Sequence, residues 1–183
     1  MEKGADLFGV ASAATIDSLA DQLRQIRKDE KIFSAIDKNP RMMPFDPVVT
    51  EQERVIQSAT DLMKDAKSVI VMGMHYPETP AERVGQPPAE AVGPYVFTQY
   101  EVNRLTGHAA YAICRMLNSL GYKALYSHDL TGAGSTVGSP RGQFSSASCN
   151  ALEAVAAGIG QMGLNGAVVT EEYGIHQRFV AIV

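Results

Sequence analysis

Residues 156–183, AAGIGQMGLNGAVVTEEYGIHQRFVAIV, contain the pattern on which the choice of fold depends. Gly158, Gly160 and Gly163 match the spacing G-x-G-x-x-G. In a dinucleotide-binding fold these glycines follow a strand and open a helix, because the pyrophosphate rests on the amides at the helix start. Here an alanine-rich run typical of a helix precedes the glycines, and a β-branched run typical of a strand follows them. This order excludes such a dinucleotide site and leaves the glycines for a helix end, a tight turn or close approach of the backbone to a flat ligand.

The composition limits the classes of function that the chain can have. It has 183 residues, of which 45% are hydrophobic, and a formal net charge of -4. This length predicts one domain, 1–183, with a substantial core, and the negative charge disfavours nucleic acid as a direct partner. Without a long apolar run or a basic leader, we expect a cytoplasmic protein with no membrane partner. Cys114 and Cys149 form no C-x-x-C pair, which indicates free thiols.

Apolar periodicity predicts a mixture of helices and strands. A long amphipathic helix over 99–122, ended by Gly121, is expected to bury Val102, Leu105, Ala109, Ala112, Ile113, Met116 and Leu120. Before this helix we expect a strand near residue 5, a helix over 16–28 capped by Ser12 or Thr15, an irregular crossing over 37–49, a helix over 51–66, a buried strand over 67–77 and a loop or lid over 78–94. After it we expect a short strand over 123–130, a polar loop over 131–150 and a helix from residue 150 that ends at Gly160 or Gly163. The chain is then expected to form a final hairpin of two strands joined by a turn at 171–174.

The final stretch resembles a segment shared by epoxyqueuosine reductases and reductive dehalogenases. In that family a small-residue helix runs into G-[LI]-G-x-[MI]-G, a hydrophobic strand, T-P-E-[YF]-G and an arginine-containing strand. GADLFGVAS at 4–12, AKSVIVMGMHYP at 66–77 and TGHAAYAICRMLNSLGYKA at 106–124 occur in the matching order. The similarity extends from about Gly4 to Val183 and is strongest after residue 155.

The resemblance implies a corrinoid-binding domain with an α+β, nitroreductase-like fold: three layers, with helices on both faces of a mainly antiparallel sheet. Members of the family bind cobalamin in the base-off form and use the reduced cobalt for reductive chemistry. Their electrons come from a following ferredoxin-like domain with 4Fe-4S clusters. Since this chain has no cysteine run, we expect that domain in the full-length protein, or a separate electron donor.

The family motif also implies candidate site residues. Tyr100 and His75 are candidate proton donors, although spacing alone does not separate Tyr100 from Tyr95 or Tyr111. The histidines lack the spacing to Cys, Asp or Glu that builds a metal site, so no protein-bound metal is expected. The candidate cofactor-binding residues are Gly158, Gly160, Met162, Gly163, Asn165, Gly166, Thr170, Tyr173, Arg178, Ser139 and Arg141.

Two positions depart from the family motif and keep several functions open. Leu164 stands where relatives carry a cation, and Glu171 replaces the proline of T-P-E-Y-G. The first hypothesis is the cobalamin-binding portion of an iron–sulfur-dependent oxidoreductase, similar to epoxyqueuosine reductase or a reductive dehalogenase. The alternatives are a non-catalytic corrinoid-binding or carrier module, which Leu164 favours, and an FMN-binding nitroreductase-like protein. The substrate stays open, and a homodimer is compatible with each hypothesis.

Overall fold

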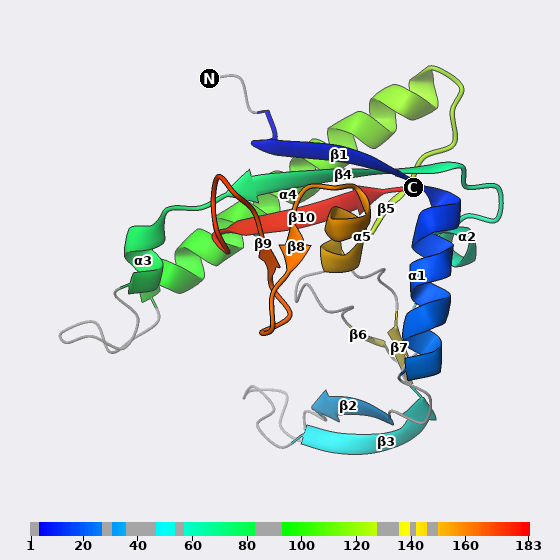
Figure 1. Ribbon diagram of the computed structural model, residues 1–183, viewed down its shortest axis with the longest axis horizontal. Helices are drawn as coiled ribbons and strands as arrows, with labels where there is room; N and C mark the ends of the chain where they lie inside the picture. The colour runs from blue at the N-terminus through cyan, green and yellow to red at the C-terminus, as the bar shows by residue number, and fades with distance from the viewer. Residues whose placement is uncertain are drawn as a thin grey trace.

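The protein has an α+β fold built on an antiparallel sheet (Figure 1). The computed structural model describes residues 4–26, 31–35, 47–53, 57–82, 93–127, 136–139, 142–145 and 150–183. The elements, in chain order, are β1 (Leu7–Ser12), α1 (Ala13–Ile26), β2 (Lys31–Ala35), β3 (Pro47–Glu53), α2 (Ala59–Leu62), β4 (Ser68–His75), α3 (Glu78–Glu82), α4 (Gly93–Ser119), β5 (Tyr126–Ser127), β6 (Thr136–Ser139), β7 (Gly142–Ser145), α5 (Asn150–Ala156), β8 (Gln161–Met162), β9 (Val168–Val169) and β10 (Gln177–Ile182).

The central sheet has the strand order β1-β4-β10-β5, and all its pairs are antiparallel. The strand β4 pairs with β1 from Ser68 to Gly73 and with β10 from Ile70 to His75. The last strand of the chain therefore lies inside the sheet, between β4 and β5. This arrangement brings the end of β4 beside the start of β10, with Gln177 opposite His75.

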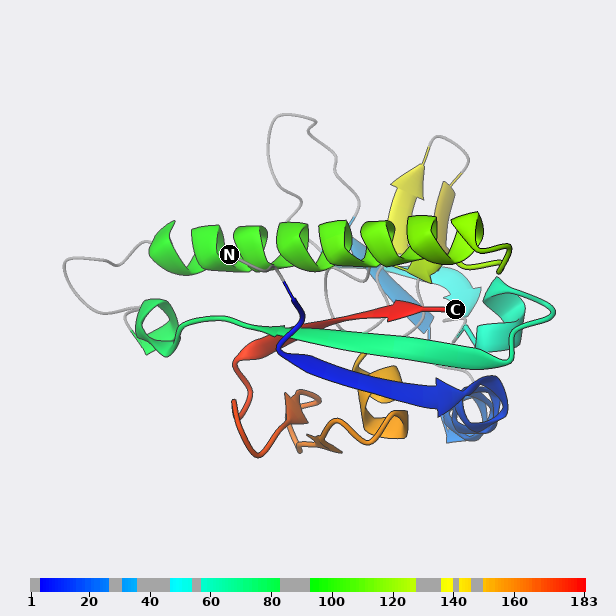
Figure 2. The ribbon, with the colours of Figure 1, turned by 90° about the horizontal axis from the view of Figure 1, so that it is seen from above.

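Helices cover both faces of this sheet (Figure 2). Because side chains alternate along a strand, Val69 and Val71 face a cluster that includes residues of α1 and α5. Met72 faces the opposite way and packs with Val180 and with Ala110 of α4. The expected α+β class, with helices on both faces and β4 buried on both, is confirmed. Within the described part of the chain, no helix is long and apolar enough to cross a membrane.

The long helix α4 begins earlier than expected and buries a different stripe. It starts at Gly93 and ends at Ser119, and Gly121, with a φ of +88°, forms the expected helix stop just beyond it. Leu105, Ala109 and Ile113 pack inward as predicted. The buried face of α4, however, is centred on Val102, Thr106, Ala110 and Cys114. Ala112, Met116 and Leu120, which were expected to be buried, are exposed. The sheet under α4 is narrow, so only the central stripe of the helix is covered.

Several local predictions are wrong in detail. The helix expected over 51–66 is replaced by β3, which ends at Glu53, and by the single turn α2. The region 78–94, expected as a loop, contains α3 and the start of α4, and the polar stretch contains the β6–β7 hairpin. Short strands and turns of this kind depend on pairing partners that local periodicity does not reveal. Residues 37–46 of the expected crossing and 128–130 of the expected strand lie outside the described residues.

Caps explain where α1 and α2 begin. The backbone N–H of Thr15 donates to Ser12 Oγ at 3.1 Å, so Ser12 caps α1. Ser58 and Asp61 form a capping box at α2: Ser58 Oγ accepts from Asp61 N at 3.1 Å, and Asp61 Oδ2 accepts from Ser58 N at 2.9 Å.

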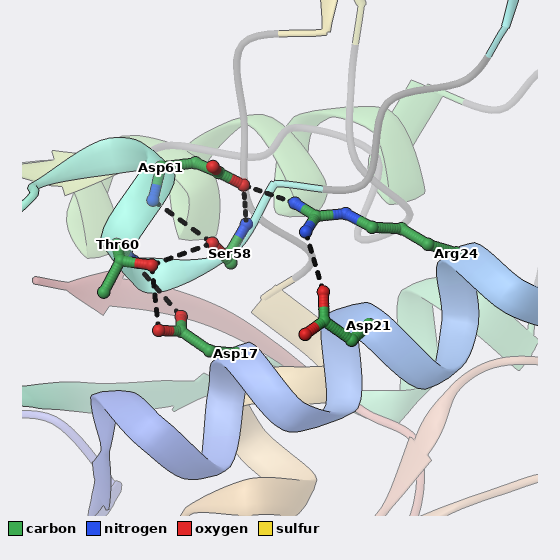
Figure 3. A network of polar contacts seen from close by, with 6 residues as sticks. All are labelled: Asp17, Asp21, Arg24, Ser58, Thr60 and Asp61. Atoms are coloured by element: carbon green, nitrogen blue, oxygen red, sulfur yellow. Dashed lines mark hydrogen bonds and ion pairs between the residues drawn. The ribbon is translucent and has the colours of Figure 1, made fainter.

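Polar contacts then tie α2 to α1 (Figure 3). Thr60 Oγ1 donates to Asp17 at 2.9 Å, and Arg24 bridges Asp21 and Asp61. The backbone bond from Ser58 is the main cause that lowers the pKa of Asp61 below its ordinary value. This carboxylate therefore stabilises the fold above about pH 4, and its contribution is lost as the pH falls through the lowered pKa.

Replacing Ser58 by alanine removes one half of the capping box. The orphan amide of Asp61 then loses its acceptor, and we expect a loss of about 1 kcal/mol in the free energy of unfolding. Urea denaturation at pH 7 measures this loss. Ser18→Ala, an exposed serine within α1, is the matched control and is expected to change the value by less than about 0.5 kcal/mol. Equal effects of the two variants would contradict the role of the cap.

The glycine-rich stretch forms a hairpin of its own. A positive φ of +74° at Gly158 ends α5, so the stop comes before Gly160 and Gly163. The strand β9 pairs with β8, not with β10, and the expected hairpin of two final strands is therefore wrong. The turn itself is present: Thr170 and Gly174 exchange backbone hydrogen bonds at 2.8 and 3.1 Å. The order helix, glycines, strand is as predicted.

Candidate functional site

Predicted site residues from distant parts of the sequence meet where β4 ends and β10 begins, at the end of the sheet nearest α3 (Figure 1). The imidazole of His75 stacks on the ring of Tyr173, with centroids 4.5 Å apart and an interplanar angle of 28°. The backbone N–H of His75 donates to Asp6 Oδ2 at 2.8 Å. The structure thus combines one candidate proton donor with one candidate cofactor-binding residue.

A second set of polar side chains lies at the same end of the sheet, towards α4. The ring of Tyr76 stacks on that of His176 at 5.5 Å, and Tyr76 packs with Met74, Val102 and Tyr95. Beside them, Arg178 Nε donates to Gln99 Oε1 of α4 at 2.6 Å. Sequence reasoning missed Tyr76, His176 and Gln99 as a group. The available signal was the alternation of β4, which puts Tyr76 on the face of Met74.

Two tyrosine hydroxyls at this end of the sheet have perturbed acidity. Burial raises the pKa of Tyr76, and Tyr95 adds to this effect, while Gln99 and Arg178 oppose it. A hydrogen bond with Glu172 raises the pKa of Tyr173, whose hydroxyl is exposed to solvent. Both hydroxyls are therefore protonated at neutral pH and can donate hydrogen bonds or a proton.

Gln177 fixes the turn that carries Tyr173. Its Nε2 donates to the carbonyl oxygens of Val168 at 2.7 Å and Gly174 at 2.9 Å, and its Oε1 lies 3.4 Å from Thr170 Oγ1. Thr170 Oγ1 also accepts from the backbone N–H of Tyr173 at 3.1 Å. Thr170 is only 4% exposed. In this structure it holds the turn and thereby positions Tyr173 against His75.

The predicted glycines divide into two kinds. A Cβ at Gly160 would lie 2.5 Å from the carbonyl oxygen of Val169, and one at Gly163 would lie 2.9 Å from Asn165 Oδ1. Packing within the β8–β9 hairpin therefore requires glycine at Gly160, where the close atom is backbone, and leaves little room at Gly163, where the backbone oxygen of Ala167 would lie 3.2 Å away. Gly158 and Gly166 have positive φ, and a Cβ there would meet no described atom within 4 Å. The open space lies beside this second pair.

The remaining predicted residues are more dispersed. Asn165 is exposed, and its Oδ1 accepts from Ala167 N at 3.1 Å within the hairpin turn. Met162 is 40% exposed and Leu164 is fully exposed, so the hairpin presents an apolar surface. Tyr100 is 64% exposed on α4, with Arg104 nearby, and does not join the stacked rings. Ser139 lies in β6, and Arg141 lies outside the described residues.

A pocket of about 530 Å³ lies at the opposite end of the sheet. Its lining comes from the start of β4, the end of α4 and the end of β10, and includes Ile70, Leu117, Tyr122 and Ile182. No predicted site residue lines this pocket. In the described part of the chain, no group of three or more His, Cys, Asp or Glu side chains is placed to hold a metal ion. The chemistry-bearing side chains are therefore those around His75 and Arg178.

Solved structures of one enzyme share this arrangement of elements. Epoxyqueuosine reductase from Bacillus subtilis matches 98% of this chain with a TM-score of 0.54 and 18% identity. The chain shares its fold with part of epoxyqueuosine reductase. The Streptococcus thermophilus enzyme matches 100% of the chain at a TM-score of 0.50 and 19% identity. An epoxyqueuosine reductase solved with a modified tRNA stem loop matches 98% at 0.54 and 15%.

The match covers only a portion of these reductases. The chain spans 42% of the Streptococcus protein and 41% of the other two. No protein-family model matches the sequence, and no significant match was found among curated proteins. The likeness therefore shows a fold shared with part of epoxyqueuosine reductase, one of the enzymes that the sequence resembles.

Proposed function

We propose that this chain is the cobalamin-binding part of a reductase similar to epoxyqueuosine reductase. The observation that carries the proposal is the structural likeness to that enzyme over 98 to 100% of the chain. The order of motifs that suggested the family supports the same assignment. Because the chain spans about two fifths of those structures, a ferredoxin-like domain with 4Fe-4S clusters, or a separate electron donor, is the partner we propose.

The three layers support assignment to the nitroreductase-like class. An antiparallel sheet covered by α4 on one face and by α1 and α5 on the other is the expected arrangement. FMN binding in such a fold is the alternative, and the likeness to epoxyqueuosine reductase does not favour it. We therefore propose a corrinoid as the cofactor, and the experiment that tests it also tests flavin binding.

The side chains around His75 and Arg178 fit a corrinoid. A corrin is a broad apolar ring edged by amides, with a phosphate in its nucleotide tail. Two buried polar atoms, Gln99 Nε2 and His176 Nδ1, have no protein partner and could bond such amides. On the opposite face of the sheet, beside α5, the open sides of Gly158 and Gly166 and the exposed side chains of Met162 and Leu164 offer a separate surface that an apolar ring could approach.

The chain's own residues would then position and protonate a substrate. Bound cobalamin supplies reducing equivalents through its cobalt. We place Tyr173 as the proton donor because its ring stacks on His75 and its hydroxyl is solvent-exposed. His75 holds the tyrosine ring by stacking, and Gln177 fixes the turn beneath it. Tyr76 is buried, so its hydroxyl is suited to orienting a ligand.

Titration of the purified chain with cobalamin under reducing conditions tests the proposal. We expect the absorption spectrum to shift to that of the base-off form, with saturable binding. The parallel titration uses FMN, monitored by quenching of flavin fluorescence. Absence of a cobalamin shift would overturn the proposal, and FMN binding in its place would support the alternative.

One observation favours a second candidate, a corrinoid-binding module without catalysis. Leu164 is fully exposed at a position where the family motif carries a cation. Leucine can neither donate a proton nor hold an anionic substrate. Both candidates predict cobalamin binding. Turnover of a reducible substrate with an artificial electron donor separates them, because only the first predicts it.

A further inference from the structure

Five side chains at the end of the sheet form a polar group on the face covered by α4. We call Arg178, Gln99, Tyr76, Tyr95 and His176 the Arg178 cluster. They come from three separate parts of the chain: the end of β4, the first turns of α4, and the start of β10 with the residues before it. Antiparallel pairing of β10 with β4 brings these parts together.

Gln99 orients Arg178 and is oriented by it. The guanidinium Nε can only donate, so it must meet Gln99 Oε1, which it does at 2.6 Å. The amide is therefore fixed with Nε2 pointing away from Arg178 Nε. The two terminal nitrogens of the guanidinium remain, and these are the atoms that form a fork on an oxyanion.

The cluster contains two buried nitrogen atoms that have no hydrogen-bond partner among the described residues, Gln99 Nε2 and His176 Nδ1. Tyr76 is 7% exposed, its hydroxyl donates a long bond of 3.5 Å to the carbonyl oxygen of Ile175, and the side chains of Gln99 and Tyr95 are its hydrogen-bonding neighbours. Buried polar groups of this kind are ordinarily satisfied, and the amide Nε2 of Gln99 can only donate, so it calls for an acceptor beside Arg178.

The Arg178 cluster carries a positive charge, which favours binding of an anion. The partner of Arg178 is a neutral amide, and no carboxylate among the described residues pairs with the guanidinium. By contrast, Arg24 and Arg104 each pair with acidic side chains. Arg178 is half-buried, so its charge is less screened than that of a surface arginine.

We propose that the Arg178 cluster binds a phosphate group. A carboxylate is satisfied by the guanidinium fork alone, whereas further donors from Gln99 and a tyrosine suit the additional oxygens of phosphate. The phosphate belongs either to the nucleotide tail of the proposed cofactor or to a separate phosphate-bearing ligand. The first source rests on the proposed function, but the anion site itself does not.

Calorimetric titration with inorganic phosphate, at constant ionic strength, tests the site. We expect saturable binding by the natural chain and binding at least about tenfold weaker in Arg178→Met, because the fork is lost. Gln99→Glu leaves the arginine in place but pairs it with a carboxylate, and we expect a similar loss. This second variant keeps the test valid if Arg178→Met does not fold.

Arg115→Met is the matched control. Arg115 is an exposed arginine on α4 that lies over Tyr111, away from the cluster, and its removal changes the net charge equally. Unchanged phosphate affinity in Arg115→Met supports the site. Equal weakening by Arg115→Met and Arg178→Met, no binding to the natural chain, or acetate binding as tight as phosphate would each overturn it.

Cobinamide, which lacks the nucleotide tail and its phosphate, separates the two sources. If the tail occupies the cluster, Arg178→Met weakens binding of cobalamin and leaves that of cobinamide unchanged. If both corrinoids bind the variant normally while inorganic phosphate does not, the phosphate belongs to a separate ligand. Phosphate binding without any corrinoid binding would overturn the proposed function and leave the anion site standing.

Discussion

Gly160→Ala is expected to cost more than about 3 kcal/mol of unfolding free energy, the largest effect of any single methyl group added to the glycine-rich hairpin. The new Cβ would lie 2.5 Å from the carbonyl oxygen of Val169 and 2.8 Å from Cγ1 of Val168. Val169 is paired with Gln161 in the β8–β9 hairpin, so its backbone cannot retreat without breaking that pairing. Urea denaturation measures the loss, which corresponds to roughly 6 to 12 °C in Tm.

Gly158→Ala is the matched control, because it adds the same methyl group two residues earlier. No described atom lies within 4 Å of that position, and the cost comes only from the φ of +74°. We expect a loss of about 1 to 2 kcal/mol. Equal losses in the two variants, or a loss under about 1 kcal/mol in Gly160→Ala, would contradict a packing role for Gly160.

Much of the sheet could be predicted because its strands carry strong local patterns. The β-branched run before His75 predicts β4, and Gly121 marks the end of α4. Other features could not be predicted, among them β3, the short helices α2 and α3, the β6–β7 hairpin and the pairing of β8 with β9. Their sequences are short or polar, and the partner strand or cap, rather than periodicity, determines their conformation.

Individual residues of the candidate site could be predicted from the sequence, but their arrangement in space could not. His75 and Tyr173 were each expected to serve the site, yet nothing local in the sequence places them in contact. Their stacking follows from the register that puts Gln177 opposite His75. The same register places Arg178 within reach of Gln99, a residue that the sequence did not single out. Long-range strand pairing thus creates the site.

Gln177→Leu is expected to destabilise the protein by about 2 to 5 kcal/mol, because it leaves two carbonyl oxygens in a largely buried place without their donor. Gln177 is 7% exposed, and its Nε2 bonds Val168 O and Gly174 O at 2.7 and 2.9 Å. Leucine has a similar volume but no donor. Urea denaturation gives the loss in free energy of unfolding.

The same substitution is expected to loosen the turn that holds Tyr173 against His75. Ring-current shifts of the His75 protons in NMR spectra report that stack, and we expect them to decrease in Gln177→Leu. Gln161→Leu, at an exposed position of β8, makes the same chemical change away from the turn and is expected to alter neither measurement. If Gln177→Leu lowers stability but leaves the His75 shifts unchanged, the amide stabilises the fold without positioning Tyr173, and the turn must be held by Thr170 and the backbone bonds to Gly174 alone.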